Sequence, residues 1–360
     1  MGFKCGIVGL PNVGKSTLFN ALTSGKAVAS NYPFCTIEPN VGMVAVPDDR
    51  LSQIQAIVNS QQVIPASMHF VDIAGLVKNA SKGDGLGNQF LANIRETQAI
   101  VHVVRCFDND DITHVEDRID PLSDVEIIET ELYLSDIERT EKQIEKIKKV
   151  AKSGNKSAKE HLALHEKLLS RLNTLEPFEL TEPMAEIAQE MGLLSQKPMM
   201  YVANVDENSL EGNHYVEALS KHAASFNRPC IVVCASIEAE LADLEAEEQG
   251  AFLEDLGLKE SGLNQLIRSG YRLLNLHNYF TAGPKEIRAW TIPIGSTAPK
   301  AAGVIHTDFL KHFIRAEVVS FDNFIAHNGA QGAKNSGCLQ VEGKDYVVLD
   351  GDIIHFLVGK

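Results

Sequence analysis

The residues most able to do chemistry lie close to the start of the chain, where residues 9–16 read GLPNVGKS and match the phosphate-loop pattern GxxxxGK[ST]. In such a loop the backbone N–H groups surround the β-phosphate, Lys15 reaches the β- and γ-phosphates, and the Ser16 hydroxyl ligates Mg²⁺. Residues 3–8 predict a buried strand before the loop and residues 15–22 predict a helix after it, as the motif requires. We therefore expect this loop to bind a nucleoside triphosphate, and we expect Lys15 to be catalytic as well. The predicted binding residues are Asn12, Val13, Gly14, Lys15, Ser16 and Thr17.

A second phosphate-side element is the DxxG sequence Asp72-Ile73-Ala74-Gly75, at the end of the predicted strand 68–72. An aspartate at that strand end can hold Mg²⁺, and the Gly75 N–H can contact the γ-phosphate during hydrolysis. Thr36, which ends the sequence NYPFCT, is expected to complete the Mg²⁺ coordination once triphosphate is bound. The predicted metal ligands are thus Ser16, Thr36 and Asp72. The glycine-rich stretch after Gly75 predicts a switch segment that orders around the γ-phosphate.

The base-reading element is altered. GTPases of this architecture use NKxD at the end of a late strand, and the aspartate accepts two hydrogen bonds from guanine. Here the sequence is Asn204-Val205-Asp206-Glu207, so valine replaces lysine and the longer glutamate replaces aspartate. Because discrimination through paired hydrogen bonds depends on their geometry, strong guanine selectivity is not expected. The predicted base-side residues are Asn204, Val205, Glu207, Ala235 and Ser236.

The residue that usually positions the attacking water is missing. Many GTPases place a glutamine directly after DxxG, but this chain has Leu76, which cannot hydrogen-bond water, so slow intrinsic turnover is expected. His114, in the loop after the strand 100–107, is a candidate replacement, and unchanged turnover in a His114→Ala variant would exclude it. Arg95 and Arg105 are further candidates for stabilising charge. Asn12 is a candidate ligand for K⁺ near the phosphates, in which case turnover should differ between sodium and potassium buffers.

Short apolar runs predict the parallel strands that position these residues. They are residues 68–72, 100–107, 199–204 and 230–235. A doubly wound sheet binds its ligand outside the carboxyl ends of its strands, and the residues named above follow those ends. The first part of the chain therefore predicts a doubly wound nucleotide-binding domain.

Two further regions have different patterns. Between residues 121 and 197, apolar residues recur at spacings of three and seven, which predicts two long helices in an antiparallel, coiled-coil-like hairpin. Its tip, residues 142–159, carries seven lysines and one acid, Glu145, and is either a contact for phosphates or a solvated face. The acidic run 238–248 is expected to be solvated.

Beyond about residue 278, apolar runs at 286–294, 314–321, 346–349 and 353–358 predict a small mixed α+β domain.

Composition restricts the class of protein. The net charge of −15 argues against general attraction to nucleic acid, so any such contact must use a local basic patch. The six cysteines are scattered without a CxxC pair, which is typical of a reducing compartment. We find no apolar run long enough for a membrane span and no signal-peptide pattern. A cytoplasmic monomer with no membrane contact is expected.

With these motifs in view, the chain resembles the Obg-like ATPases of the YchF family, within the TRAFAC class of P-loop proteins. The resemblance rests on GLPNVGKS (9–16), NYPFCT (31–36), DIAGLVKNASKGDGLGNQFL (72–91), NVDE (204–207) and FTAGPKEIRAWT (280–291). It implies a nucleotide domain (1–121 and 198–278), a helical coiled-coil insertion (122–197) and a C-terminal TGS domain of β-grasp fold (279–360), a module associated with RNA binding. It also implies hydrolysis of ATP in preference to GTP and a link to ribosomes and translation.

The favoured function is thus a slow, Mg²⁺-dependent ATPase that acts as a switch on the ribosome or its RNA. One alternative is an Obg-type GTPase in which Glu207 still accepts guanine, and competition between ATP and GTP separates the two. Another is a nucleotide-gated RNA- or ribosome-binding protein in which hydrolysis is incidental; it predicts that a variant that binds but does not hydrolyse retains function. A helicase is disfavoured by the charge and by the lack of a second motor core.

Overall fold

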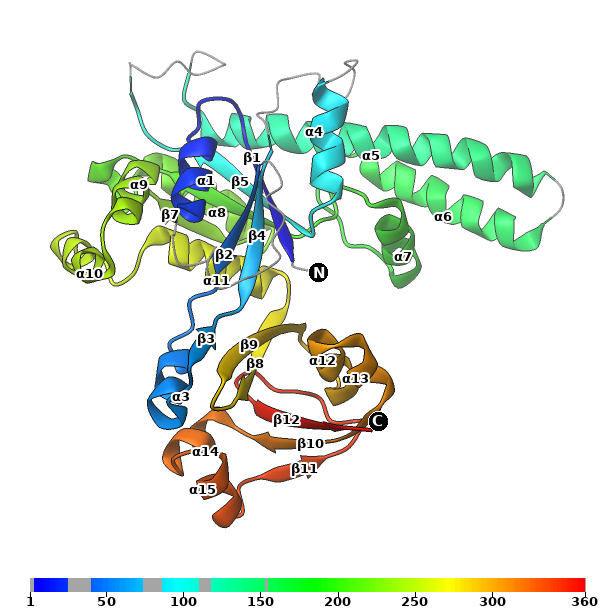
Figure 1. Cartoon of the computed structure of the whole chain (residues 1–360). Coiled ribbons are helices and arrows are strands. Elements are labelled where there is room, and N and C mark those ends of the chain that lie inside the picture. Colours follow the sequence, from blue (N-terminus) through cyan, green and yellow to red (C-terminus); the bar gives the residue numbers. More distant parts are fainter. Residues whose placement is uncertain (1–2, 25–39, 74–85, 110–117, 153–154, 360) are drawn as a thin grey trace.

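The computed structural model describes residues 3–24, 40–73, 86–109, 118–152 and 155–359. Their strands form two sheets, which lie one above the other in Figure 1, and a long pair of helices projects sideways from the upper sheet. Thr36, Gly75, Leu76 and His114 lie outside the described residues, so their predicted roles stay predictions.

The first sheet holds the strands predicted to position the site. Among the described strands its order is β2-β4-β1-β5-β6-β7. The neighbouring pairs from β4 to β7 are parallel, whereas β2 runs antiparallel to β4. The strands are β1 (Lys4–Val8), β2 (Val41–Ala45), β4 (Ser67–Asp72), β5 (Ala99–Arg105), β6 (Met199–Asn204) and β7 (Cys230–Val233).

The antiparallel strand β2 was not predicted, because its run is short and Gly42 weakens the strand signal. The glycine has a packing reason. A Cβ at this position would lie 1.9 Å from Cγ2 of Thr23, at the end of the helix that follows the phosphate loop. Gly42 therefore lets β2 approach that helix closely.

Helices cover both faces of the first sheet, because successive strand residues point to opposite sides. On one face of β6, Met200 packs against Gly270 of α11: a Cβ added at Gly270 would lie 3.3 Å from the Met200 methyl group. On the other face, the Tyr201 hydroxyl donates a hydrogen bond to Glu129 of α5, and the Tyr201 ring contacts His222 of α8. The helices around the sheet are α1 (Lys15–Thr23), α4 (Leu86–Arg95), η2 (Glu207–Ser209), α8 (His214–Ser225), α9 (Ala235–Asp243), α10 (Ala246–Asp255) and α11 (Gly262–Leu273).

The acidic run 238–248 is not solvated throughout. Glu238, on α9, is only 4% exposed, and its carboxylate accepts a hydrogen bond of 2.6 Å from the backbone N–H of Gly262. Burial raises the pKa of Glu238, although this hydrogen bond opposes the shift. The expectation of a fully solvated run is therefore wrong at Glu238, which holds the start of α11 against α9.

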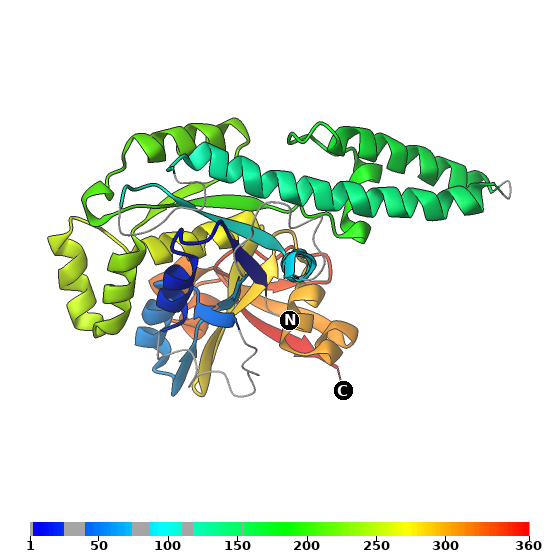
Figure 2. The same ribbon diagram turned by 90° about the horizontal axis from the view of Figure 1, so that it is seen from above.

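Two long helices lie side by side and extend away from the sheet, as Figures 1 and 2 both show: α5 (Pro121–Ala151) and α6 (Lys156–Leu172). Asp120 caps α5 by accepting a hydrogen bond from the Ser123 N–H, with Pro121 at the first position. A third helix, α7 (Glu182–Met191), packs Met184, Ile187 and Met191 against this pair and was not predicted. Asp136, fully buried on α5, accepts hydrogen bonds from the N–H groups of Leu194 and Ser195 and so fixes the chain where it returns toward β6.

The second sheet is mixed and has the order β11-β10-β12-β8-β9-β3 among the described strands. The predicted runs 286–294, 314–321 and 353–358 correspond to strands. The apolar run 346–349 does not form a strand: only an isolated bridge joins Val347 to Thr297, because the chain turns at both sides of it. The elements are α3 (Arg50–Val58), β3 (Gln62–Ile64), β8 (Leu276–Ala282), β9 (Glu286–Pro293), α12 (Ala298–Ile305), α13 (Thr307–Lys311), β10 (Phe313–Val319), α14 (Phe321–Ala326), α15 (Ala330–Asn335), β11 (Gln340–Glu342) and β12 (Ile353–Val358).

An early segment completes this late sheet. Strand β3 pairs in parallel with β9, with Val63 opposite Ile287. The chain therefore leaves the first sheet after β2, contributes α3 and β3 to the second, and returns through β4. This crossing was not predicted, and the expected domain boundary after residue 278 falls within β8.

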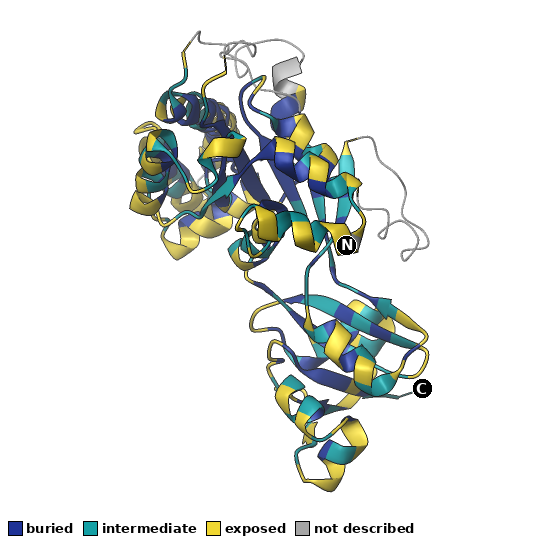
Figure 3. Cartoon of the chain, turned by 90° about the vertical axis from the view of Figure 1, so that its left-hand side faces the viewer, coloured by how far each residue is buried: buried dark blue, intermediate teal, exposed yellow. Residues whose placement is uncertain are grey.

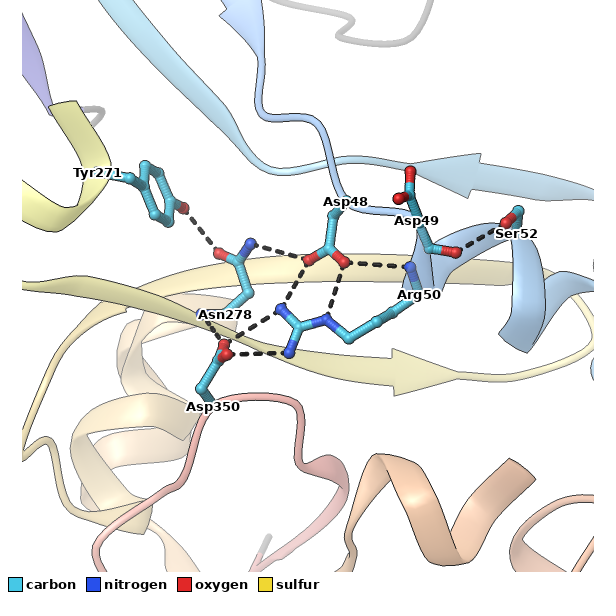
Figure 4. Close-up of polar contacts among 7 residues, drawn as sticks. All are labelled: Asp48, Asp49, Arg50, Ser52, Tyr271, Asn278 and Asp350. Atoms are coloured by element: carbon cyan, nitrogen blue, oxygen red, sulfur yellow. Dashed lines mark hydrogen bonds and ion pairs between the residues drawn. The ribbon is translucent and has the colours of Figure 1, made fainter. Parts of the chain in front are cut away.

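A polar network joins the two sheets at this crossing (Figure 4). The Arg50 guanidinium donates two hydrogen bonds of 2.8 Å to Asp48 and two, of 3.0 and 3.2 Å, to Asp350. The Asn278 backbone N–H donates to the same Asp350 carboxylate, and the Asn278 side chain accepts a hydrogen bond from the Tyr271 hydroxyl. Arg50 thus holds the end of the first sheet against β8 and the loop before β12.

Buried side chains concentrate in the strands of both sheets, and exposed ones cover the outer helix surfaces (Figure 3). Across the described ranges, no helix combines the length and the apolar character needed to cross a membrane.

Candidate nucleotide-binding site

The phosphate loop connects β1 to α1, and its backbone is set by two left-handed residues, Asn12 (φ 62°) and Gly14 (φ 96°). Gly14 is the residue that precedes α1, and no side chain caps that end of the helix. The N–H groups of the first turn of α1, which begins at Lys15, are therefore available to an anion, and the helix dipole favours negative charge there.

Lys15 is buried within this loop, with 7% of its surface exposed, and its ammonium group lies 2.5 Å from the Leu10 carbonyl oxygen. Burial lowers the pKa of Lys15 to about 8, although the Asp72 carboxylate acts in the opposite direction. Burial makes the charged form of the Lys15 ammonium group unfavourable. A bound phosphate would stabilise that form, because a nearby opposite charge favours the charged state.

Asp72 stands at the carboxyl end of β4 and faces the start of α1. The Ser16 hydroxyl donates a hydrogen bond of 3.3 Å to one Asp72 carboxylate oxygen, Oδ2. The other oxygen, Oδ1, is buried and has no hydrogen-bond partner among the described residues. An unpaired buried carboxylate oxygen beside a hydroxyl is the type of donor set that a hard divalent cation prefers.

Asn204, at the end of β6, ties the phosphate loop to the start of α9. Its side-chain amide donates a 2.9 Å hydrogen bond to the Val13 carbonyl and accepts a 3.0 Å bond from the Ala235 N–H. The contact is close, since a Cβ at Gly14 would lie only 2.3 Å from the Asn204 amide nitrogen. Asn204 therefore positions two loops, and Val13 takes part through its backbone while its side chain is buried.

A cavity of about 660 Å³ opens at the carboxyl ends of β1, β5, β6 and β7. Predicted residues from three separate loops meet in it. They are Asn12, Gly14, Lys15, Ser16, Thr17, Asn204, Val205, Glu207, Ala235 and Ser236. The cavity also has a wall that was not predicted, formed by Phe107, Asp108 and Asn109 after β5.

The two acids of the NVDE sequence differ in their surroundings. Asp206 turns back on the chain and accepts a 3.2 Å hydrogen bond from the Asn208 N–H, which caps the short helix η2. Glu207 is exposed at the cavity, and Val205 is buried, with 2% of its surface exposed. Both residues line the cavity, and Glu207 is the more exposed of the two.

Relatives of this chain are similar over nearly its whole length. It is 57% identical to the ribosome-binding ATPase YchF of Haemophilus ducreyi over 359 residues, and 55% identical to the protein of the same name from Escherichia coli O157:H7 over 360 residues; each alignment covers 99% of both chains. The chain belongs to the YchF family. A YchF relative from Bacillus subtilis, also named a ribosome-binding ATPase, is 51% identical over the same share of both chains.

Family models and solved structures agree with this YchF assignment. Residues 4–205 match a model described as "50S ribosome-binding GTPase", and residues 276–359 match the YchF-GTPase C-terminal model, described as "Protein of unknown function (DUF933)". The structure of the Schizosaccharomyces pombe YchF GTPase superposes with a TM-score of 0.90 at 37% identity, covering 99% of this chain and 98% of that one. A GTP binding protein from Pyrococcus horikoshii OT3, at TM-score 0.62 and 20% identity, shares the fold. The α/β P-loop GTPase fold is thus established.

Neither of the two arginines considered for the YchF site is among the described residues that line the cavity. The Arg95 guanidinium, on α4, donates a 2.6 Å hydrogen bond to the Ser135 hydroxyl on α5 and does not line the cavity. Arg105 donates to the backbone carbonyls of Phe107 and Asn109. The signal for the missed wall was present, since Phe107 is an aromatic residue two positions after the end of a fully buried strand.

Proposed function

We propose that this chain is a ribosome-binding ATPase that hydrolyses ATP slowly in the presence of Mg²⁺ and works as a regulatory switch in the cytoplasm. The observation that carries the proposal is the identity of more than half of all positions, over 99% of both chains, with relatives named ribosome-binding ATPase. The altered base reader, with Val205 buried and Glu207 exposed at the cavity, supports adenine over guanine. We further propose that the protein acts as a monomer.

The phosphate end of the cavity supports the hydrolytic part. Lys15 and the first-turn N–H groups of α1 would bind the β- and γ-phosphates. Ser16 and Asp72 would hold Mg²⁺, together with Thr36 from outside the described residues, and the bound ion supplies neutralisation of phosphate charge. We retain Gly75 as the γ-phosphate contact, His114 as the water-positioning group and Asn12 as a K⁺ ligand. Equal turnover in sodium and potassium would contradict the role of Asn12.

The two other parts of the chain are proposed as contact modules. The pair α5 and α6 is proposed as a coiled-coil insertion within residues 122–197, and residues 279–360 as a TGS domain of β-grasp type beside the nucleotide domain (1–121 and 198–278). The lysines near the tip are exposed, which supports contact with ribosomal RNA. They are Lys142, Lys146, Lys148, Lys149, Lys152, Lys156 and Lys159.

ATP should bind at least about tenfold more tightly than GTP, as the relatives named ATPase suggest. A site that lacks the paired acceptor for guanine leaves polar groups of that base unpaired, and this penalty falls on GTP. The measurement is displacement of a fluorescent nucleotide by ATP and by GTP with Mg²⁺ present, followed by phosphate release with each. A Glu207→Asp variant is the matched control and should shift the ratio toward GTP. A clear preference of the unaltered protein for GTP would replace the ATPase with an Obg-type GTPase, the alternative that the "GTPase" name of the fission yeast relative keeps open.

Reversing charge at the helical tip should weaken ribosome binding without changing ATP turnover. Lys146 and Lys149 lie three residues apart, are exposed, and have no ion-pair partner within the described residues. Replacing both by Glu should weaken ribosome binding, measured by co-sedimentation. A plot of the logarithm of the binding constant against the logarithm of the salt concentration should become less steep by about one unit per lysine. The control, with the same charge change at Lys221 and Lys259, should bind normally. Equal binding by both variants would locate the contact elsewhere.

A further inference from the structure

The cavity wall formed by residues 107–109, which follows β5, is held from inside the protein by Arg105. Arg105 is the last residue of β5 and only 1% of its surface is exposed. Its guanidinium donates a 3.2 Å hydrogen bond from Nε to the Phe107 carbonyl and a 2.9 Å bond from Nη2 to the Asn109 carbonyl. The same group lies 4.8 Å from the centre of the Phe107 ring. One side chain therefore fixes both the backbone and the aromatic ring of this wall.

The start of α8 holds the wall from a second side. Asn213, which caps α8, donates a 2.7 Å hydrogen bond to the Cys106 carbonyl. The Tyr215 hydroxyl donates a 3.0 Å hydrogen bond to the Asp108 carboxylate. A loop fixed in this way presents Phe107, half-buried, to the cavity without having to become ordered when a ligand binds.

The wall lines the same cavity as the phosphate loop and the base reader, so its own contacts must indicate which part of a nucleotide it serves. Residues 12–17 supply the phosphate contacts, and the hydrogen bonds of Arg105 described above reach none of them. The wall shares the cavity with Val205 and Glu207, the residues of the base reader. An aromatic ring that lines the same cavity as the base reader offers a surface on which the flat face of a nucleobase stacks, and such stacking needs the ring in a fixed position.

We infer that Arg105 is a positioning residue for the nucleobase: it holds Phe107 and residues 107–109 as the surface against which the base of ATP packs. This inference rests on the proposed function, because it assumes a nucleotide in the cavity. It assigns Arg105 to base binding instead of to stabilising phosphate charge. The role requires arginine, because its planar fork reaches two carbonyl oxygens and stacks on a ring at once, whereas lysine is a point donor.

The test compares a ligand that has a base with one that lacks it. Affinities of ATP and of inorganic tripolyphosphate, both with Mg²⁺, are measured by calorimetry for the unaltered protein and for the Arg105→Lys variant. We expect ATP binding to weaken about tenfold in the variant while tripolyphosphate binding stays within about twofold, because only the base-side wall is loosened. In steady-state kinetics KM for ATP should rise with kcat nearly unchanged. A Tyr215→Phe variant, which loses only the bond to Asp108, should show a smaller change in the same direction.

Three outcomes would overturn the inference. They are an equal loss of ATP and tripolyphosphate binding, a fall in kcat at constant KM, or no change in either variant. If Arg105→Lys does not fold, as judged by thermal unfolding, the Tyr215→Phe comparison decides alone. Failure of the proposed ATPase function can be distinguished from failure of this inference. If the unaltered protein prefers GTP, the affinities of GTP and tripolyphosphate are compared in the same variants.

Discussion

A Lys15→Met variant should lose ATP hydrolysis by at least about 10²–10³-fold while remaining folded, which is the loss typical when one preorganised charge at a reacting group is removed. The reason lies in the position of the ammonium group, which is buried at the end of the phosphate loop beside the uncapped start of α1. Methionine has similar length and no charge, so the loop can keep its packing. The measurement is phosphate release under single-turnover conditions, with thermal unfolding as the check on folding. Hydrolysis within tenfold of the unaltered protein would contradict the assignment of the loop.

The same residue predicts a dependence on pH. Lys15 has a pKa of about 8 in the folded protein and an ordinary value of 10.5 when unfolded, so between these values the unfolded chain binds more protons. The free energy of unfolding should therefore rise by roughly 3 kcal/mol from pH 8 to 10.5, and the cost of burying the charge is fully present below pH 8. Lys15→Met should lack this rise and should be at least as stable at pH 7. ATP affinity of the unaltered protein should fall as the pH rises above about 8.

Replacing Arg50 by alanine should destabilise the second sheet by about 2–4 kcal/mol. Once the guanidinium is gone, Asp48, whose side chain is 8% exposed, would keep a 3.2 Å hydrogen bond from the backbone N–H of residue 50 and a 3.5 Å contact to Asn278. It would lose its charged partner, and a buried carboxylate without such a partner is costly. Asp350, whose side chain is 54% exposed, contributes less, and Asp350→Asn should cost under about 1 kcal/mol. Arg50→Lys should fall between the two, because lysine cannot bond both carboxylates with a planar fork.

Trp290 makes this effect measurable. It is the single tryptophan of the chain and lies on β9, within the second sheet, so its fluorescence in urea reports on that sheet. The midpoint for Arg50→Ala should shift strongly and that for Asp350→Asn only slightly, while nucleotide affinity changes little in both. Equal midpoints for Arg50→Ala and the unaltered protein would show that the network does not stabilise the second sheet.

The sequence predicted the site best where function requires a fixed local pattern. The phosphate loop, Asp72, Asn204 and Ala235 lie at or just after strand ends, and a parallel sheet brings such ends to one edge. The role of the Asn204 amide as a tie between Val13 and Ala235 was not predictable, because spacing says nothing about which atoms a side chain bonds. Phe107 was missed for a different reason: the predicted strand 100–107 included it, whereas β5 ends at Arg105.

The fold was hardest to predict where a strand or helix pairs or packs with a segment that is far away in the sequence. Strand β3 has three residues and no alternation of its own, and it exists because β9 offers it an edge. Helix α7 is short and gains its stability by packing on α5 and α6. The antiparallel strand β2 is short and contains Gly42. Local propensity cannot report partners that are so far along the chain.

The pairing of β3 with β9 also constrains how the protein can be made. During synthesis, α3 and β3 emerge from the ribosome about 220 residues before their partner strand exists. At roughly 5–20 residues per second, these segments wait for on the order of ten seconds or more with an unpaired edge. A fragment that begins at β8 would likewise lack an edge strand and the Arg50 contact. We therefore expect the second sheet to form last, only after β12 has been made, and the separately expressed C-terminal part to be aggregation-prone.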